Sequence, residues 1–380
     1  MPILLPTLWV LKSAERGDPA NACVDACLAL RYGYGQLGNR ADLQFGLAAR
    51  HRLTVTGRLC RYLPGCPARW HAITIADLLD HTSGIPDYLN DLAASWPPKP
   101  ATLGQLIASF AAAPLHFAPG TRMRYSNSGY VLLGALIEHI TGQTSAAFLQ
   151  QNIFGPLGMT RTGTDTTAIR PGHARGYYAD GSQPAAYPLS AFFADGGLYS
   201  TVADLQRWDD AVQDSTLIPA ALTAQMLTVH AACPPPGSPG GCLTAAGLGY
   251  GYGRFVDRTR YGPLYQHVGR IDGWGSVNGI YLRQHEHIII LANRSALPRT
   301  RPLSARPPGW FPAGRWSRAP PSARPRFSSR FSRRSGCSSR ACSASSARRA
   351  SPSATWPVKT SPSRSSRSWP SRWEQSPASA

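Results

Sequence analysis

Lysine is nearly absent from this 380-residue chain: of its 39 basic residues only three are lysine. The residue three positions before Lys12, Lys99 and Lys359 is tryptophan each time, so the pattern Ser-x-x-Lys does not occur. That pattern puts a serine hydroxyl and an amine on one face of a helix, where the amine can accept the proton of the nucleophile. Chemistry that needs such a pair is therefore excluded for this sequence.

Long apolar runs are also missing. Acidic residues are nearly absent from the C-terminal part of the chain. No run of about 18 apolar residues occurs, which argues against a membrane-spanning helix. The net charge of +19 suggests a nucleic-acid or anionic-membrane partner when taken alone. Residues 1–293, however, carry 21 basic against 19 acidic residues, and residues 294–380 carry 18 against the single Glu374. The body is near neutral, and we expect no nucleic acid to bind it.

The segment 294–380 has too few core-forming residues to fold by itself. Only six of its 87 residues are Ile, Leu, Val, Met or Phe, and Arg, Ser and Pro crowd it. We expect it to be disordered. One interpretation is an RNA- or membrane-binding arm of the arginine/serine type. The other is an out-of-frame translation of GC-rich DNA, which the composition and the lack of a regular motif favour.

The eight cysteines do not favour a structural zinc, because no two Cys-x-x-Cys pairs occur. Their spacing allows small disulfide rings, and free buried thiols are the alternative. The N-terminus is briefly apolar from Ile3 to Leu11 but lacks a basic region and a clean cleavage site, so it is a weak signal peptide. The close pairs are Cys23/Cys27, Cys60/Cys66, Cys233/Cys242 and Cys337/Cys342.

Helices and strands are both expected in the body. Capping patterns begin helices at Thr74, Thr102 and Thr201, and the longest helix begins near residues 126–128 and ends at Gly142. Later segments have strand character, namely residues 250–256, 279–282 and 287–291. The sequence therefore predicts an α+β fold.

Five short motifs follow one another in the body, and each is weak alone. Together, in this order, they resemble the serine beta-lactamase-like family, which includes class C beta-lactamases, D-alanyl-D-alanine carboxypeptidases and esterases. The resemblance implies an antiparallel sheet flanked by helices, with an inserted all-helical region, over residues 32–293. Residues 1–31 then form a poorly defined N-terminal segment and 294–380 the tail. The motifs are residues 78–88 (LLDHTSGIPDY), 125–130 (YSNSGY), 153–159 (IFGPLGM), 196–201 (GGLYST) and 267–273 (HVGRIDG).

The resemblance also implies the catalytic residues. Tyr125 matches the family's tyrosine, which shares general-base and proton-shuttle duty, and Asn127 matches the asparagine that binds the substrate amide. His267 and Gly269 match the His-x-Gly form of the strand that aligns the substrate and helps to form the oxyanion hole. Each has a plainer interpretation when taken alone: a packed aromatic for Tyr125, an N-cap for Asn127 and an ordinary strand histidine for His267.

The family's nucleophile segment is missing. Residues 34–43 resemble its early strand and hairpin and residues 47–53 the end of its nucleophile helix, so the gap lies near Gln44 and Phe45. The family's C-terminal helix, expected after Asn293, is replaced by the basic tail. Each lost buried side chain costs about 1.5–3 kcal/mol, which is large against a net stability of about 5–15 kcal/mol. We therefore expect an incomplete and weakened fold.

Other side chains have simpler roles. Ser83 is expected to belong to a turn, and no Gly-x-Ser-x-Gly elbow occurs in the body. His285 and His287 are spaced to face one way on a strand as metal ligands, but a solvated strand face is the favoured interpretation. No cofactor and no metal are expected.

The sequence thus predicts a lineage of serine hydrolases that cleave an amide, lactam or ester through an acyl-enzyme, with this chain inactive as written. The alternative is a pseudoenzyme that binds peptidoglycan-like peptides or a protein partner without turnover. A third possibility is nucleic-acid binding through the tail. The resemblance implies small-molecule or peptide acyl substrates, and its His-x-Gly form implies esterases and peptidases rather than antibiotic-destroying enzymes. Family members are usually periplasmic or secreted, and the sequence carries no signal for an oligomeric state.

Overall fold

A computed structural model describes ten stretches of the chain. They are residues 7–13, 30–32, 53–92, 101–164, 174–178, 180–184, 192–235, 238, 240–241 and 247–294. All of them belong to one compact unit, Met1–Arg318. The expected gap near Gln44 and Phe45, the basic tail after Arg294, and Cys23, Cys27, Cys242, Cys337 and Cys342 lie outside these stretches.

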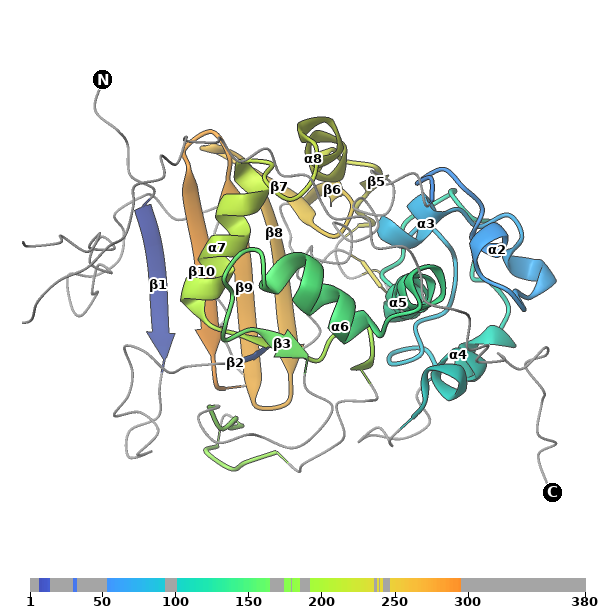
Figure 1. The fold of residues 1–380 in the computed structure, drawn as a ribbon, viewed down its shortest axis with the longest axis horizontal. Coiled ribbons are helices and arrows are strands. Elements are labelled where there is room, and N and C mark those ends of the chain that lie inside the picture. The colour runs from blue at the N-terminus through green and yellow to red at the C-terminus, as the bar shows by residue number, and fades with distance from the viewer. Residues whose placement is uncertain are drawn as a thin grey trace, which may run out of the picture. The chain divides into compact units, whose positions relative to one another are not determined.

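Most described strands form one seven-stranded sheet (Figure 1). Every neighbouring pair is antiparallel except β1 and β10, which run parallel. A second sheet has three antiparallel strands. The order in the first sheet is β1 (Thr7–Ser13), β10 (Glu286–Ala292), β9 (Trp274–Tyr281), β8 (Gly262–Ile271), β7 (Phe255–Thr259), β6 (Gly247–Tyr250) and β5 (Ala231–Ala232); in the second it is β2 (Leu30–Tyr32), β4 (Leu198–Ser200) and β3 (Gly163–Thr164).

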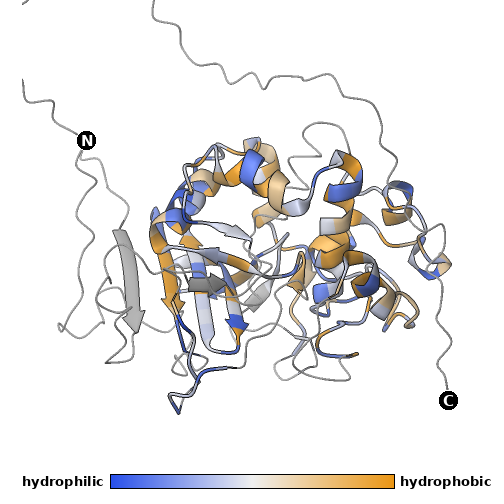
Figure 2. Cartoon of the chain, turned by 60° about the horizontal axis from the view of Figure 1, so that its bottom comes forward, coloured by the Kyte–Doolittle hydropathy of each residue, from blue (hydrophilic) through white to orange (hydrophobic). Residues whose placement is uncertain are grey.

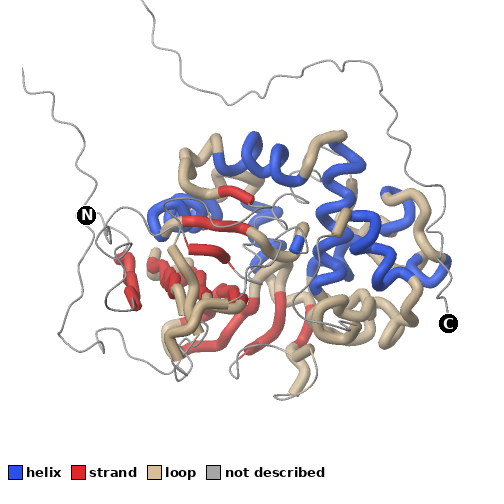
Figure 3. The backbone as a smooth tube through the Cα atoms, turned by 90° about the horizontal axis from the view of Figure 1, so that it is seen from below, coloured by secondary structure: helices blue, strands red, loops and turns tan. Residues whose placement is uncertain are grey.

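The helices of the middle of the chain gather beside the sheet, and α7 packs against β10 (Figures 1 and 3). This arrangement confirms the predicted α+β class. None of the helices in the described stretches is long and apolar enough to cross a membrane. In chain order they are α2 (Leu59–Tyr62), η2 (Ala68–Trp70), α3 (Ile75–Leu79), α4 (Leu103–Ala111), α5 (Asn127–Thr141), α6 (Ser145–Leu149), the π-helical turn η3 (Gln150–Phe154), α7 (Val202–Gln213) and α8 (Ala220–Leu227).

The predicted helix starts are confirmed by hydrogen bonds at their caps. The Thr74 and Thr102 side chains accept from the third backbone N–H of α3 and α4, and the reciprocal bonds complete two capping boxes. Thr201 caps α7 through Asp204 N–H. α5 ends at Gly142, whose φ of 71° is the left-handed conformation expected of a C-cap glycine.

α5 is the central helix of the helical region. Its first eleven residues, Asn127 to Ile137, are all buried, so the helix is enclosed by its neighbours α3, α4 and α6. Packing on all sides therefore fixes the position of the first turns of α5. α4, by contrast, buries one face, with Leu106, Ile107 and Phe110 among its buried residues. Figure 2 shows hydrophobic and hydrophilic residues side by side along the helices.

One predicted strand is wrong. Residues 250–256 were expected to form a single strand, but a turn at 251–254 separates β6 from β7. Gly253 has a φ of 83°, and a Cβ on Gly251 would lie 2.5 Å from the Met226 carbonyl oxygen. The two glycines favour a tight reversal, and this outweighs the strand preference of the aromatic residues around them.

The disulfide interpretation of the Cys60/Cys66 pair is confirmed. The two cysteines form a disulfide, with Cα atoms 5.4 Å apart. They are six positions apart in the sequence, so the bond closes a small ring that includes part of α2. Cys233 is disulfide-bonded as well. The alternative of free buried thiols does not hold for these three cysteines.

Candidate active site

Tyr125, Asn127 and His267 come together where the start of α5 meets β8. Tyr125 directly precedes the N-cap Ser126, and Asn127 is the first residue of α5. His267 lies in β8, and its ring centre is 6.2 Å from that of Tyr125. The start of the helical region and the sheet thus bring the rings of Tyr125 and His267 near each other.

Among the described strands, the part of β8 that carries His267 and Gly269 has a neighbour on one side only. β7 pairs with β8 as far as Phe255 opposite Gln266, and then ends. From His267 to Ile271, β9 is the sole partner of β8 within the described stretches. In the described part of the chain, the other edge of this segment makes no strand pairing.

His267 is a buried neutral imidazole whose two ring nitrogens differ in their hydrogen bonding. Its Nδ1 lies 2.8 Å from the Val268 carbonyl oxygen, which can only accept, so Nδ1 carries the proton. The unprotonated Nε2 is buried and has no hydrogen-bond partner among the described residues. Burial lowers the pKa of His267 to about 3, and the nearby Arg254 charge adds to this effect. His267 is thus an acceptor at neutral pH.

Asn127 is oriented by a carboxyl group behind it. Its Nδ2 donates to Asp87 Oδ2 at 2.9 Å, so its Oδ1 is directed away from Asp87. Oδ1 is buried without a hydrogen-bond partner in the described part of the chain. Burial raises the pKa of Asp87, although the carboxyl also accepts from Leu89 N–H and Asn90. The site therefore presents an amide oxygen that can accept a ligand N–H.

His81 is a site residue that the sequence analysis missed. Its carbonyl oxygen accepts from Arg124 N–H at 2.9 Å and its Nδ1 from Ser126 N–H at 3.2 Å. Its ring centre is 4.2 Å from that of Tyr125, so His81 holds Tyr125 by the ring and by both flanking amides. Its φ of 62° is left-handed, a conformation that histidine tolerates better than most residues.

The interpretation of residues 82–84 as a turn is confirmed. Ser83 is buried, and its hydroxyl accepts from Ile85 N–H at 3.3 Å. Gly84 has a φ of 74°, and a Cβ there would lie 2.4 Å from the Phe117 carbonyl oxygen. The turn sets the direction of the chain directly after His81.

Aromatic rings shield the site. Tyr125 packs on the cluster of Met123, Ala231, Tyr250 and Phe255. Tyr250 is edge-on to Phe255 with ring centres 4.7 Å apart, and it lies 4.8 Å from His81. Burial raises the pKa of Tyr250 well above its usual value and lowers that of His81, so both stay neutral.

Both interpretations of the His285 and His287 pair are wrong. His285 lies in the turn before β10 with a φ of 54°, whereas His287 is in β10, 1% exposed, with Nε2 donating to Gln213 Oε1 at 3.2 Å. The two rings do not share a strand face, and His287 is not solvated. No group of three metal-ligating side chains occurs in the described stretches.

We expect His287 to make the stability of the protein depend on pH. Burial lowers the pKa of His287 to about 4, and the Arg254 charge adds to this effect. The Asp210 carboxylate lies 3.6 Å from Nδ1 and is 44% exposed, so water screens its charge. Unfolding lets His287 gain a proton below about pH 6.5, so its contribution to stability is present above that pH. Relative to His287→Gln, the free energy of unfolding should fall by about 1.4 kcal/mol per pH unit between about pH 6 and 4.

Urea titrations of both proteins across this range measure the difference directly. The glutamine keeps a donor toward Gln213, so other groups that titrate in the same range cancel in the comparison. A difference that stays constant with pH would show that His287 does not titrate on unfolding.

Comparisons with known proteins agree with the motifs. A sequence model of the Beta-lactamase family matches residues 46–306. Penicillin-binding protein 4* of Bacillus subtilis (strain 168) is 28% identical over 254 residues, which cover 62% of this chain and 54% of that protein. The chain spans about half the length of the curated relatives it matches.

Two solved structures are similar in fold. The D-stereospecific amidohydrolase from Streptomyces sp. has a TM-score of 0.60 at 26% identity, covering 70% of this chain and 83% of that one. The D-amino acid amidase from Ochrobactrum anthropi SV3, complexed with D-phenylalanine, has a TM-score of 0.61 at 25% identity, covering 71% and 79%.

Proposed function

The chain belongs to the beta-lactamase family, and we propose that it is a member without acyl-enzyme activity. The observation that carries the proposal is the absence of Ser-x-x-Lys from all 380 residues. Acyl transfer by this family requires a nucleophile and a base beside it. His267 and Tyr125 cannot replace the missing serine nucleophile or the lysine base that would lie beside it.

The remaining residues keep roles in orienting a ligand. Asn127 Oδ1 accepts an N–H, and His267 Nε2 accepts a second donor. Gly269 lies two residues further along β8, on the edge that makes no strand pairing in the described part of the chain, where a ligand main chain can pair. Tyr125 closes the site from the helical side. The ligand class that fits such a site is a small-molecule or peptide amide, lactam or ester.

A second candidate function, non-catalytic binding of a peptide or a protein partner, is favoured by one observation. Asn127 Oδ1 and His267 Nε2 are both buried without hydrogen-bond partners among the described residues. Such atoms destabilise a fold by about 1–3 kcal/mol each unless a partner satisfies them. A ligand that donates to both would remove that cost on binding.

Turnover assays on the full chain test the proposal. We expect nitrocefin, p-nitrophenyl acetate and D-phenylalanine amide to be hydrolysed no faster than in buffer. Calorimetric titration with D-phenylalanine amide tests the binding function: reversible binding that is lost in Asn127→Ala supports it. Hydrolysis that disappears in His267→Gln would contradict the proposed inactivity, because it would arise in this site.

A further inference from the structure

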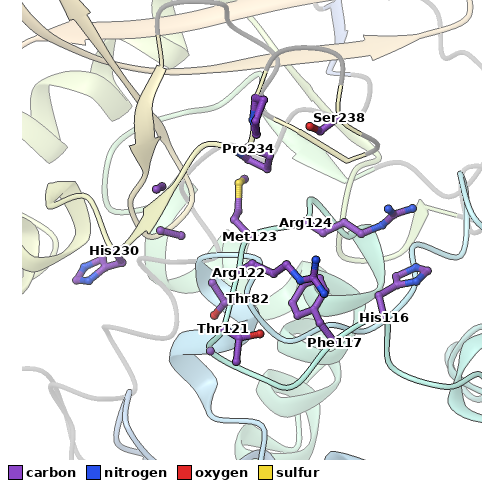
Figure 4. A pocket seen from close by; sticks show the side chains of 14 residues that line it. Thr82, His116, Phe117, Thr121, Arg122, Met123, Arg124, His230, Pro234 and Ser238 are labelled. Carbon is purple, nitrogen blue, oxygen red and sulfur yellow. The ribbon is translucent and has the colours of Figure 1, made fainter.

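A cavity of about 670 Å³ lies next to the segment that leads into Tyr125. One wall is formed by residues within 116–124 (Figure 4). The opposite wall is formed by β5 together with Pro234, Pro235 and Ser238. Thr82 completes the lining on the side of the turn at 82–84. None of Tyr125, Asn127 and His267 lines this cavity, so it is a separate place in the fold.

The described lining carries positive charge and no carboxylate. Arg124 and His116 are already engaged, because both contact Asp91, at 2.5 and 2.9 Å. Arg122 pairs with no carboxylate in the described part of the chain, and its guanidinium lies 5.1 Å from the ring centre of Phe117. Its charge is therefore available for an anion that enters the cavity.

Beside this charge the cavity has an apolar surface. Met123 is 4% exposed and belongs to the cluster with Ala231, Tyr250 and Phe255. Its side chain is directed toward Pro234 across the cavity, while Arg122 and Phe117 lie to one side (Figure 4). An apolar group placed here contacts methionine and proline while an attached anion remains within the reach of Arg122.

Backbone hydrogen bonds fix the first wall. Gly120 N–H donates to the Thr82 carbonyl oxygen at 2.9 Å, and His116 N–H donates to that of Gly84 at 2.8 Å. Tyr125 N–H donates to the Gly240 carbonyl oxygen at 2.7 Å, which links this wall to the opposite one. A cavity built in this way needs little rearrangement to bind a ligand.

We propose that this cavity binds the C-terminus of a peptide whose last residue is apolar. The terminal carboxylate pairs with Arg122, and the last side chain lies on Met123 and Phe117. Among the described strands β5 ends the order and pairs with β6 alone, so an extended main chain can run along its other edge. The binding requires neither an acyl-enzyme nor the residues of the candidate active site.

Binding of N-acetyl-glycyl-L-leucine to the full chain, followed by calorimetry or NMR, tests the proposal. We expect a Kd on the order of 0.1–1 mM for a ligand of this size. The C-terminal amide of the same dipeptide should bind about tenfold more weakly, because it lacks the charge that Arg122 recognises. The acid should bind the Arg122→Gln variant as weakly as the amide binds the unmodified chain.

Arg260→Gln is the matched control, since Arg260 is another exposed arginine that lies over an aromatic ring, 4.6 Å from the centre of Tyr261. It should bind the acid as the unmodified chain does, and circular dichroism checks that both variants fold. Equal binding of acid and amide, or an unchanged Kd in Arg122→Gln, overturns the proposal. Loss of acid binding in Asn127→Ala with Arg122→Gln unaffected places the ligand in the candidate active site and also overturns it. Hydrolytic activity would overturn the proposed function and leave this inference standing.

Discussion

Replacing Arg254 with methionine should lower the free energy of unfolding by about 3–5 kcal/mol, because it leaves a buried carboxyl group without its counter-charge. Arg254 is 1% exposed, and its guanidinium donates to Asp209 Oδ1 at 3.3 Å and to Asn278 Oδ1 at 2.8 Å. Asn278 in turn donates to Asp209 Oδ2 at 2.7 Å. The three residues connect α7, the turn between β6 and β7, and β9. The substitution therefore removes hydrogen bonds that hold α7 and the sheet together.

The pH dependence of this loss identifies its cause. Burial raises the pKa of Asp209 to about 7 even with Arg254 beside it, and removal of Arg254 raises it further. Because a raised carboxyl pKa costs stability as pH rises, the additional loss in Arg254→Met should accumulate above about pH 7. Urea denaturation at pH 6 and pH 9 measures it, with Arg258→Met on the exposed face of β7 as the control. A loss below about 1 kcal/mol at both pH values would contradict the account.

Replacing His81 with alanine should destabilise the fold by about 3 kcal/mol or more, through three effects at one position. The imidazole fills space between Tyr125, Tyr130 and Tyr250, with ring centres 4.2, 5.1 and 4.8 Å away. Alanine leaves that space empty and removes the acceptor of Ser126 N–H. It also places a residue with no polar side chain at a φ of 62°.

A comparison of His81→Ala with His81→Asn separates these effects. Asparagine tolerates the left-handed conformation and has an oxygen that can accept from Ser126 N–H, but it lacks the ring. We expect it to lose about half as much stability as alanine. The near-ultraviolet circular dichroism of the tyrosines should change in both variants, since each frees the Tyr125 ring. Equal stability of all three proteins would show that His81 does not hold this site.

The local signals of the sequence were sufficient for much of the fold. Capping boxes at Thr74 and Thr102 and the C-cap at Gly142 depend on residues within one helical turn, so they can be read from the chain. The turn at residues 251–254 was missed because the aromatic residues beside Gly251 and Gly253 favour a strand, whereas the reversal depends on the glycines and on the close Met226 carbonyl oxygen. Tertiary contact decides such a case.

The candidate site residues were assigned only where short motifs contain them, and their roles stay predictions. Tyr125, Asn127, His267 and Gly269 stand in short motifs whose order is retained. His81 was missed because its role comes from contacts with residues more than 40 positions away, and nothing in His-Thr-Ser-Gly indicates a left-handed histidine. The buried group of Arg254, Asp209 and Asn278 escaped for the same reason: three distant polar residues show no spacing pattern.

The central claim is that this chain retains the orienting residues of a beta-lactamase-family site and lacks its nucleophile. The most direct test is the intact mass of the full chain after incubation with a fluorophosphonate and, separately, with penicillin G. The account predicts that the mass remains that of the untreated chain with both reagents, while a family member that contains Ser-x-x-Lys gains one adduct under the same conditions. A stoichiometric adduct located on any serine of this chain would contradict the claim.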